Sequence, residues 1–451
     1  MTVELHQFIT SLTVEVFAAR PRPHVEDAVK PMPWFATLVA VCTISAHAAA
    51  EPECSPTVTR EAIARCAIRA SLVVRAQTQT GEALEGRRVA VSPLLPSNPV
   101  LAFTGSNREA DVGRATNWSA TLSQELEIAG QRGARRRAAE LEAEAQGHRV
   151  TGARRDAAAS AWVAYFEALA GDDEVRLATK LATNASQIAV VARGMADRGL
   201  LSPVEADVAD ATKLGVEQSL LAAERRARTA KLTLATLLGF DPEHPLTVEG
   251  DLTPLRAIED EARASLARDG RDRPEVRALD AQRRAQEASA SAYGRARVPN
   301  PTLSLFVQND GFNERVLGAG VSLPIPLPQP LGRFNDGEIA EAHALARRAA
   351  TEAEHVRRQA RLDLLSAFAE YDMRKRQREM FTEERTSRAE QGIDAITKEI
   401  QAGRLPVRDA LVSQQVLVNL LRSNLEARLA LCIASVDVAR AAGIALDGGA
   451  R

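Results

Sequence analysis

The cysteine and histidine side chains offer this chain its most versatile chemistry, and their spacing limits what that chemistry can be. The four cysteines are Cys42, Cys54, Cys66 and Cys432, without a CxxC pair or a mixed cysteine–histidine cluster. A zinc site is therefore not expected. The seven histidines form no HxH or HxxxH pair, and no GxSxG, Walker or GxGxxG pattern occurs. We expect neither an enzyme nor a protein with a cofactor or a dedicated metal site.

The N-terminal 50 residues have the features of a secretory leader. From Met32 the chain reads "MPWFATLVAVCTISAHAAAEPE", with an apolar run over 35–45 followed by small residues suited to cleavage. We expect the mature protein to start near Ala49 or Glu51; a buried apolar helix is the alternative. Lipidation needs a small residue immediately before a cysteine, and Val41 and Glu53 stand there instead. We expect no lipid anchor.

Export would place the cysteines of the mature chain in a compartment that permits disulfides. Cys54 and Cys66 are twelve residues apart and could pair, or each could be an unpaired small apolar residue. Cys432 lies in a helical pattern and is expected in the core.

The chain repeats itself after about half its length. Asn98-Pro99-x-Leu101 returns as Asn300-Pro301-x-Leu303, and the 40-residue interval between Gly199 and Gly239 returns between Gly403 and Gly443. We therefore divide the mature chain into repeats at 51–250 and 251–451. Aromatic residues make up only 4% and apolar residues 45% of the chain, a mixture that favours long helices.

Each repeat has the same predicted order of elements. The first has a helix over 58–92, strands over 100–107 and 117–128, and a helical hairpin over about 134–239. In its second strand apolar Trp118, Ala120 and Leu122 alternate with polar residues. The second repeat has a helix over 256–297, strands over 302–309 and 315–325, and a hairpin over about 335–443, whose long helix runs to about 402. Four strands cannot close a membrane barrel, so we expect an oligomer that pools them.

The ordered motifs resemble the TolC family of outer-membrane efflux ducts. The resemblance rests on the "NP" strand starts, on "LEIAGQRGARRRAAE" and "LPIPLPQPLGRFNDGEIAEA" at the strand-to-helix junctions, and on the turns "GLLSPVEAD" and "GRLPVRDAL". It implies a mainly α-helical homotrimer with a twelve-stranded β-barrel in outer-membrane lipid of a Gram-negative bacterium. A long periplasmic α-helical barrel continues that β-barrel.

The resemblance also assigns roles to the two turns. Gly199, Leu200 and Leu201, with Gly403, Arg404 and Leu405, match the family's tip motif, which meets a periplasmic adaptor (a membrane fusion protein). They are also simply good turn residues. Glu205 and Asp409, each six residues past a tip glycine, stand where the family often has a pore-lining acid, with Asp207 nearby. The alternative is that these acids stabilise helix N-termini.

The resemblance implies a passive exit duct of a tripartite efflux system, driven by an inner-membrane pump of the RND type. "RGLLSPVEADVADA" and "LPIPLPQPLGRF" are most similar to outer-membrane proteins that export cobalt, zinc, cadmium or nickel. A duct for organic compounds and a pore-less periplasmic coiled-coil or adaptor protein are the alternatives, and the latter would lack two membrane-length strand pairs. The basic run 132–137 could lie at lipid headgroups or be solvated. With a net charge of −2, nucleic-acid binding is not expected.

Overall fold

The computed structural model describes residues 54–446 of the chain, apart from 111–112, 256–257, 269, 310–313, 329–331 and 333. The predicted leader lies outside these residues. The chain divides into one unit at Met1–Glu51 and a second at Pro52–Arg451. Everything that follows belongs to the second unit.

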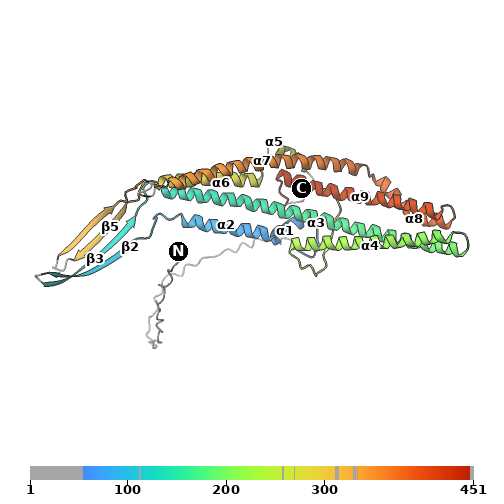
Figure 1. The fold of residues 1–451 in the computed structure, drawn as a ribbon, viewed down its shortest axis with the longest axis horizontal. Coiled ribbons are helices and arrows are strands. Elements are labelled where there is room, and N and C mark those ends of the chain that lie inside the picture. Colours follow the sequence, from blue (N-terminus) through green and yellow to red (C-terminus); the bar gives the residue numbers. More distant parts are fainter. Residues whose placement is uncertain are drawn as a thin grey trace, which may run out of the picture. The chain divides into compact units, whose positions relative to one another are not determined.

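The same order of elements occurs twice (Figure 1). A helix leads into two strands, and a long helix, a tight turn and a returning helix follow. The first set consists of α2 (Leu72–Ala90), β2 (Val100–Ala110), β3 (Gly113–Glu125), α3 (Gln131–Asp197) and α4 (Pro203–Leu238). The second set consists of α6 (Pro274–Arg295), β5 (Thr302–Asn309), β6 (Arg315–Ser322), α7 (Asp336–Glu379), α8 (Glu383–Gln401) and α9 (Val407–Ala442). Shorter elements precede each set, β1 (Thr57–Val58) and α1 (Ile63–Ala70) before the first and β4 (Thr247–Val248) and α5 (Ile258–Ala267) before the second.

The second long helix is interrupted, so the prediction of one helix running to about 402 was wrong. Thr382, between α7 and α8, has an extended backbone (φ −71°, ψ 152°), and its hydroxyl accepts a hydrogen bond from the Arg385 amide at 3.4 Å. A threonine in this conformation caps a new helix. Ser71 separates α1 from α2 in the same way within the predicted helix 58–92.

The strands of the first hairpin extend beyond the predicted alternating segments. β2 continues to Ala110 rather than 107, and β3 begins at Gly113 rather than 117. The added residues are polar on both faces, which hides them from a search for alternating hydrophobicity. They continue the backbone ladder of β2 and β3, and Glu109 and Arg114 form an exposed ion pair across it at 2.7 Å. β6 ends earlier than the predicted 325, because Pro324 cannot donate a ladder hydrogen bond.

The four longer strands form one antiparallel sheet in the order β2-β3-β5-β6. β3 is central and pairs Leu122 with Leu101 on one side and with Leu305 on the other. The pairing of β3 with β5 therefore joins the two sets of elements in one layer. β1 and β4 form a separate two-stranded parallel sheet that pairs Thr57 with Thr247.

Small side chains let the helices pack closely. Alanine dominates the buried face of α3, around the fully buried Trp162, Tyr165 and Phe166. At Gly171 an added Cβ would lie 2.8 Å from the Cα of Ala227 in α4, so this contact between the helices requires glycine. In the part of the chain that the structure describes, no helix is both long and apolar enough to cross a bilayer.

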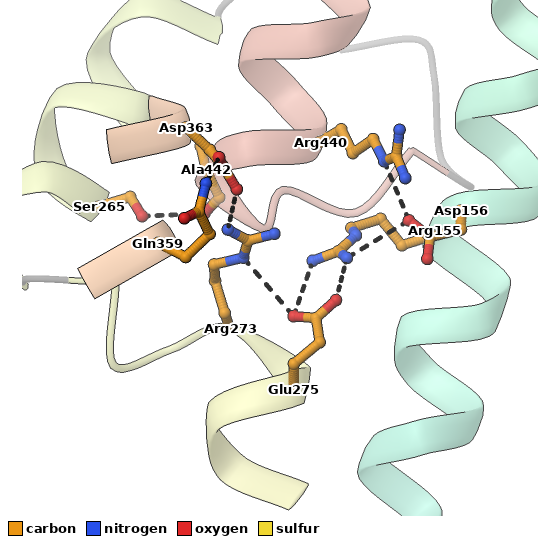
Figure 2. A network of polar contacts seen from close by, with 9 residues as sticks. All are labelled: Arg155, Asp156, Ser265, Arg273, Glu275, Gln359, Asp363, Arg440 and Ala442. Carbon is orange, nitrogen blue, oxygen red and sulfur yellow. Dashed lines mark hydrogen bonds and ion pairs between the residues drawn. The ribbon is translucent and has the colours of Figure 1, made fainter. Parts of the chain in front are cut away.

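A network of charged side chains joins the two sets of elements (Figure 2). Arg155 of α3 has a 5% exposed side chain and binds Glu275 at the start of α6. Arg273, just before α6, lies 3.5 Å from Glu275 and 3.4 Å from Asp363 of α7. Burial, the largest single influence, opposes ionisation of Glu275, but the hydrogen bond and charge of Arg155, a backbone hydrogen bond and the charge of Arg273 together outweigh it and lower the pKa of this carboxyl. The pair therefore fixes α6 between α3 and α7.

Replacing Glu275 by glutamine is expected to lower the free energy of unfolding by about 2–3 kcal/mol, because the buried Arg155 guanidinium loses the closer of its two carboxylates and keeps Asp156 at 3.4 Å. This change in the free energy of unfolding is measured from the loss of the helical circular dichroism signal with temperature. Since folding lowers the pKa of Glu275, its contribution is present at neutral pH and fades as the pH falls through the folded-state pKa. The control is Glu352→Gln, which breaks an exposed pair with Arg348 and is expected to cost at most about 0.5 kcal/mol. Equal effects of the two changes would contradict this role of the network.

Candidate functional site

One face of the sheet is apolar across all four strands. Alternate residues of a strand share a face, and so do residues paired across strands. From Leu101 the register crosses Leu122 and Leu305 to Ala319. The same face carries Phe103, Trp118, Ala120, Leu303, Val307, Leu317 and Val321. In the single chain Leu317 is 84% exposed, and a continuous apolar surface of this kind marks contact with lipid or with another protein.

The opposite face is mainly polar, with Val100, Ala102 and Val316 among its aliphatic residues. It carries Thr104, Ser119, Thr121, Ser123, Ser304 and Gln308. The hydroxyls of Thr104 and Ser119 lie 2.6 Å apart. A sheet with one apolar and one polar face can separate an apolar medium from water.

Phe306 is the aromatic exception on the polar face, and the sequence analysis missed its role. It pairs with Gly318 of β6, where an added Cβ would lie 2.3 Å from the phenyl ring. The ring therefore lies against the strand and covers the glycine. Phe306 lies between Leu305 and Val307 and therefore faces the other side of the strand, opposite a glycine. This pattern in the sequence could have indicated its role.

Both outer strands are open on one side. β2 pairs only with β3, and β6 only with β5, within the described residues. An unpaired strand edge exposes amide and carbonyl groups that favour pairing with another strand.

The helical hairpins end in two tips, which we define as residues 193–210 (first tip) and 397–414 (second tip). Both use the same backbone turn. Gly199 and Gly403 have φ values of 73° and 69°, a conformation that other residues adopt at a cost. In each tip the residue after the glycine donates its amide to the carbonyl five residues back, at 2.9 Å in the first and 3.0 Å in the second. This is the Schellman end of a helix.

The two turns also have the same length, although their prolines stand at different places. The returning helix is capped by Ser202 in the first tip and by Pro406 in the second, each three residues after the glycine. The Ser202 hydroxyl accepts a hydrogen bond from the Val204 amide at 3.3 Å, whereas proline has no side-chain acceptor. The sequence difference therefore changes the cap and not the loop.

The predicted acids occupy matching positions with different partners. Glu205 and Asp409 are both the third residue of a returning helix. The Glu205 carboxylate accepts a hydrogen bond from the Ser202 amide at 3.3 Å, which completes a capping box. The Asp409 carboxylate is exposed and forms no hydrogen bond or ion pair with the described residues. Asp207 lies 3.2 Å from Arg193. Glu205 thus has the capping contact, which leaves its role in a pore a prediction.

Arg193 and Asp210 belong to the first tip and were missed by sequence reasoning. Arg193 of α3 binds Asp210 of α4 in addition to Asp207. These hydrogen bonds raise the pKa of Arg193, so it stays charged. Both ion pairs connect α3 with α4, which run antiparallel. Which residues of the two helices lie opposite each other depends on the position of the turn, so the spacing in the sequence does not indicate these pairs.

An apolar cluster holds the two tips together. Ile188 and Ala192 of the first hairpin pack with Ile400 and Val407 of the second. The predicted tip residues Leu201 and Leu405 are half-buried against this cluster. The tip glycines are exposed, and an added Cβ at either would meet nothing within 4 Å. The glycines are therefore required by the turn, and the surface around them is free in the single chain.

The basic run 132–137 is largely paired within the chain. Arg135 lies 2.5 Å from Glu127 and Arg136 lies 2.8 Å from Glu140. Arg132 donates to the carbonyl of Ser92 at 2.8 Å. These contacts fix the junction between β3 and α3 and leave less free charge than the sequence suggests.

Cys54 and Cys66 are joined by a disulfide, which fixes the start of the described chain to α1. Cys432 is buried, and burial raises the pKa of its thiol to about 12, so the thiol is unreactive. No group of three or more histidine, cysteine or acidic side chains among the described residues could hold a metal ion.

One family model matches part of the chain. The family described as outer membrane efflux protein matches residues 66–240. The cobalt-zinc-cadmium resistance protein CzcC of Cupriavidus metallidurans is 26% identical over 309 residues, which cover 68% of this chain and 72% of that protein.

Solved structures show the same fold. The outer-membrane channel OprN superposes with a TM-score of 0.67 at 16% identity, covering 86% of this chain and 90% of that one. The outer membrane protein VceC of Vibrio cholerae superposes with a TM-score of 0.67 at 18% identity, covering 86% and 96%. The fold is thus the one found in outer-membrane channels.

Proposed function

This chain belongs to the outer membrane efflux proteins of the TolC type, and we propose that it forms, as a homotrimer, the exit duct of an RND-type tripartite system for divalent heavy-metal cations. It is a channel in the outer membrane with a periplasmic helical portion, and not an enzyme. The number of copies, the partners and the cargo are the proposed parts.

The two-faced sheet is the observation that carries the proposal. Its apolar face suits lipid and its polar face suits a water-filled passage. The apolar face carries no charge from the row of Leu303 and Val321 to the row of Val307 and Leu317. Arg315 lies in the next row, together with Trp118, and the charged pair Glu109–Arg114 lies beyond it toward the hairpin end. This arrangement fits an apolar band crossed by the strands with a polar rim outside it.

The open edges require further copies of the chain. Backbone groups left unpaired within a bilayer cost several kcal/mol each, so β2 of one copy must pair with β6 of the next. Barrels of about eight strands are filled by their own side chains, so two copies would leave little passage. Three copies give twelve strands and an open lumen.

The outer helices support the same ring. α2 exposes Leu72, Val73 and Val89, and α7 exposes Leu362 and Leu365. These helices adjoin the open strands β2 and β6. Contact between α2 of one copy and α7 of the next would bury both apolar surfaces.

The tips and the acids complete the proposed path. The exposed turns at Gly199 and Gly403 are the proposed contacts with a periplasmic adaptor, which in turn joins an inner-membrane RND pump. Three copies each of Glu205 and Asp409 would place six carboxylates near the narrow end and favour cations. Likeness to a cobalt-zinc-cadmium resistance protein supports divalent metal as the cargo.

The lipid-facing assignment is tested by two neighbouring substitutions on opposite faces of β5. Leu305→Arg places a charge on the apolar face, which is expected to cost about 2–4 kcal/mol in a bilayer. Ser304→Arg places the same charge on the polar face and is expected to leave insertion nearly unchanged. The measurement is the fraction of protein that resists protease after refolding into phospholipid vesicles. Equal insertion of both variants would refute the proposed faces.

The acid ring is tested by conductance across planar bilayers. The wild-type pore is expected to select cations and to be blocked by divalent or trivalent cations from the periplasmic side. The pair Glu205→Gln and Asp409→Asn should weaken that block by about tenfold, since a charge near a bound ion contributes about 1 kcal/mol even in water. Unchanged block and selectivity would mean that the acids serve only the helix N-termini.

A further inference from the structure

The two tips have one backbone and different side chains, which makes them directly comparable. Glycine, turn length and cap position correspond at a shift of 204 residues. Side chains at matching positions therefore point in the same direction relative to their own hairpins. Leu200 matches Arg404, and Val204 matches Arg408.

The first tip is apolar where it turns. Leu200 is 67% exposed and Val204 is 68% exposed. Both flank the glycine turn, and Val208 continues the exposed apolar surface one turn along α4. Large apolar side chains held in water at a turn favour contact with another apolar surface.

The second tip is basic at the same two positions. The Arg404 guanidinium forms two hydrogen bonds with the Glu399 carboxylate, at 2.6 Å and 2.7 Å. Its charge is therefore compensated within the tip. The Arg408 side chain is exposed and forms no hydrogen bond or ion pair with the described residues. An unpaired guanidinium favours a carboxylate partner.

The overall charges of the tips differ in the same sense. Two arginines and four acids give the first tip a net charge of −2, whereas two arginines, one lysine and two acids give the second a net charge of +1. Net charge thus favours a carboxylate partner at the second tip over the first, where Arg198, beside the turn, donates a hydrogen bond to the Gly194 carbonyl.

The apolar and the basic surface belong to two tips that pack against each other. The apolar cluster of Ile188, Ala192, Ile400 and Val407 packs the hairpins together just behind the turns. We propose that the paired tips of one chain form a two-part docking surface for the end of a single helical hairpin, which places an apolar side chain on Leu200 and Val204 and a carboxylate on Arg408. This rests on the proposed docking of an adaptor and adds what its end must carry.

The probe for the test is a synthetic antiparallel helical hairpin, closed by a disulfide and labelled with fluorescein, whose turn carries Glu and Leu. Its variants replace Glu by Gln or Leu by Ser. Binding to the full-length protein in detergent is measured by fluorescence anisotropy at low and high salt. Arg408→Gln and Val204→Ser are compared with Arg348→Gln, an exposed arginine of α7 far from the tips along the chain.

Arg408→Gln is expected to weaken binding of the Glu–Leu hairpin about three- to fivefold, and only at low salt. It should not change binding of the Gln–Leu hairpin. Val204→Ser should weaken binding of the Glu–Leu hairpin about threefold at either salt concentration. It should not change binding of the Glu–Ser hairpin. Arg348→Gln should change nothing.

Three results would overturn the proposal. The first is that the Glu–Leu hairpin does not bind at millimolar concentration. The second is that both tip variants weaken the binding of all probes equally. The third is that the weaker binding in Val204→Ser depends on salt. If the pore still conducts in a planar bilayer while the probes fail, the tip chemistry is wrong and the duct stands. If conduction also fails, the proposed function is wrong.

Discussion

A four-stranded sheet that is apolar on one face and open at both edges is not a complete structure in water or in a bilayer. Its apolar face needs lipid, and its edge amides and carbonyls need partners. Both needs are met when copies of the chain join edge to edge into a closed wall. The central pairing of β3 with β5 brings strands from both halves of the chain into one sheet, so each copy supplies four strands to that wall.

The helical part follows from the same requirement. Long helices leave the sheet from β3 and β6, and in the proposed assembly they continue a wall around the same passage. Alanine-rich surfaces and the contact of Gly171 with Ala227 let neighbouring helices approach closely. The buried pair of Arg155 with Glu275 then fixes the meeting of the two halves. At the far end, the apolar cluster behind the turns keeps the two tips together.

The order of elements could be predicted from the sequence because strong signals mark it. The "NP" motifs and the glycines at 199 and 403 stand at the ends of helices and strands, and alternation at Trp118, Ala120 and Leu122 indicates a strand. The break at Thr382 could not be predicted, because a single cap residue competes there with an uninterrupted helical pattern. The polar ends of β2 and β3 were hidden because the backbone ladder, and not burial, holds them. At the candidate site, the turn residues could be placed but their partners could not. Arg193 and Asp210 meet only because two helices run antiparallel.

Closure of one barrel by three copies of this chain can be tested through the mass of the purified protein in detergent. Light scattering, with the detergent contribution subtracted, should give a single species of about three chains. A folded, detergent-free single chain of stable helical content would contradict it, because its sheet would then be stable with both edges open and its apolar face in water.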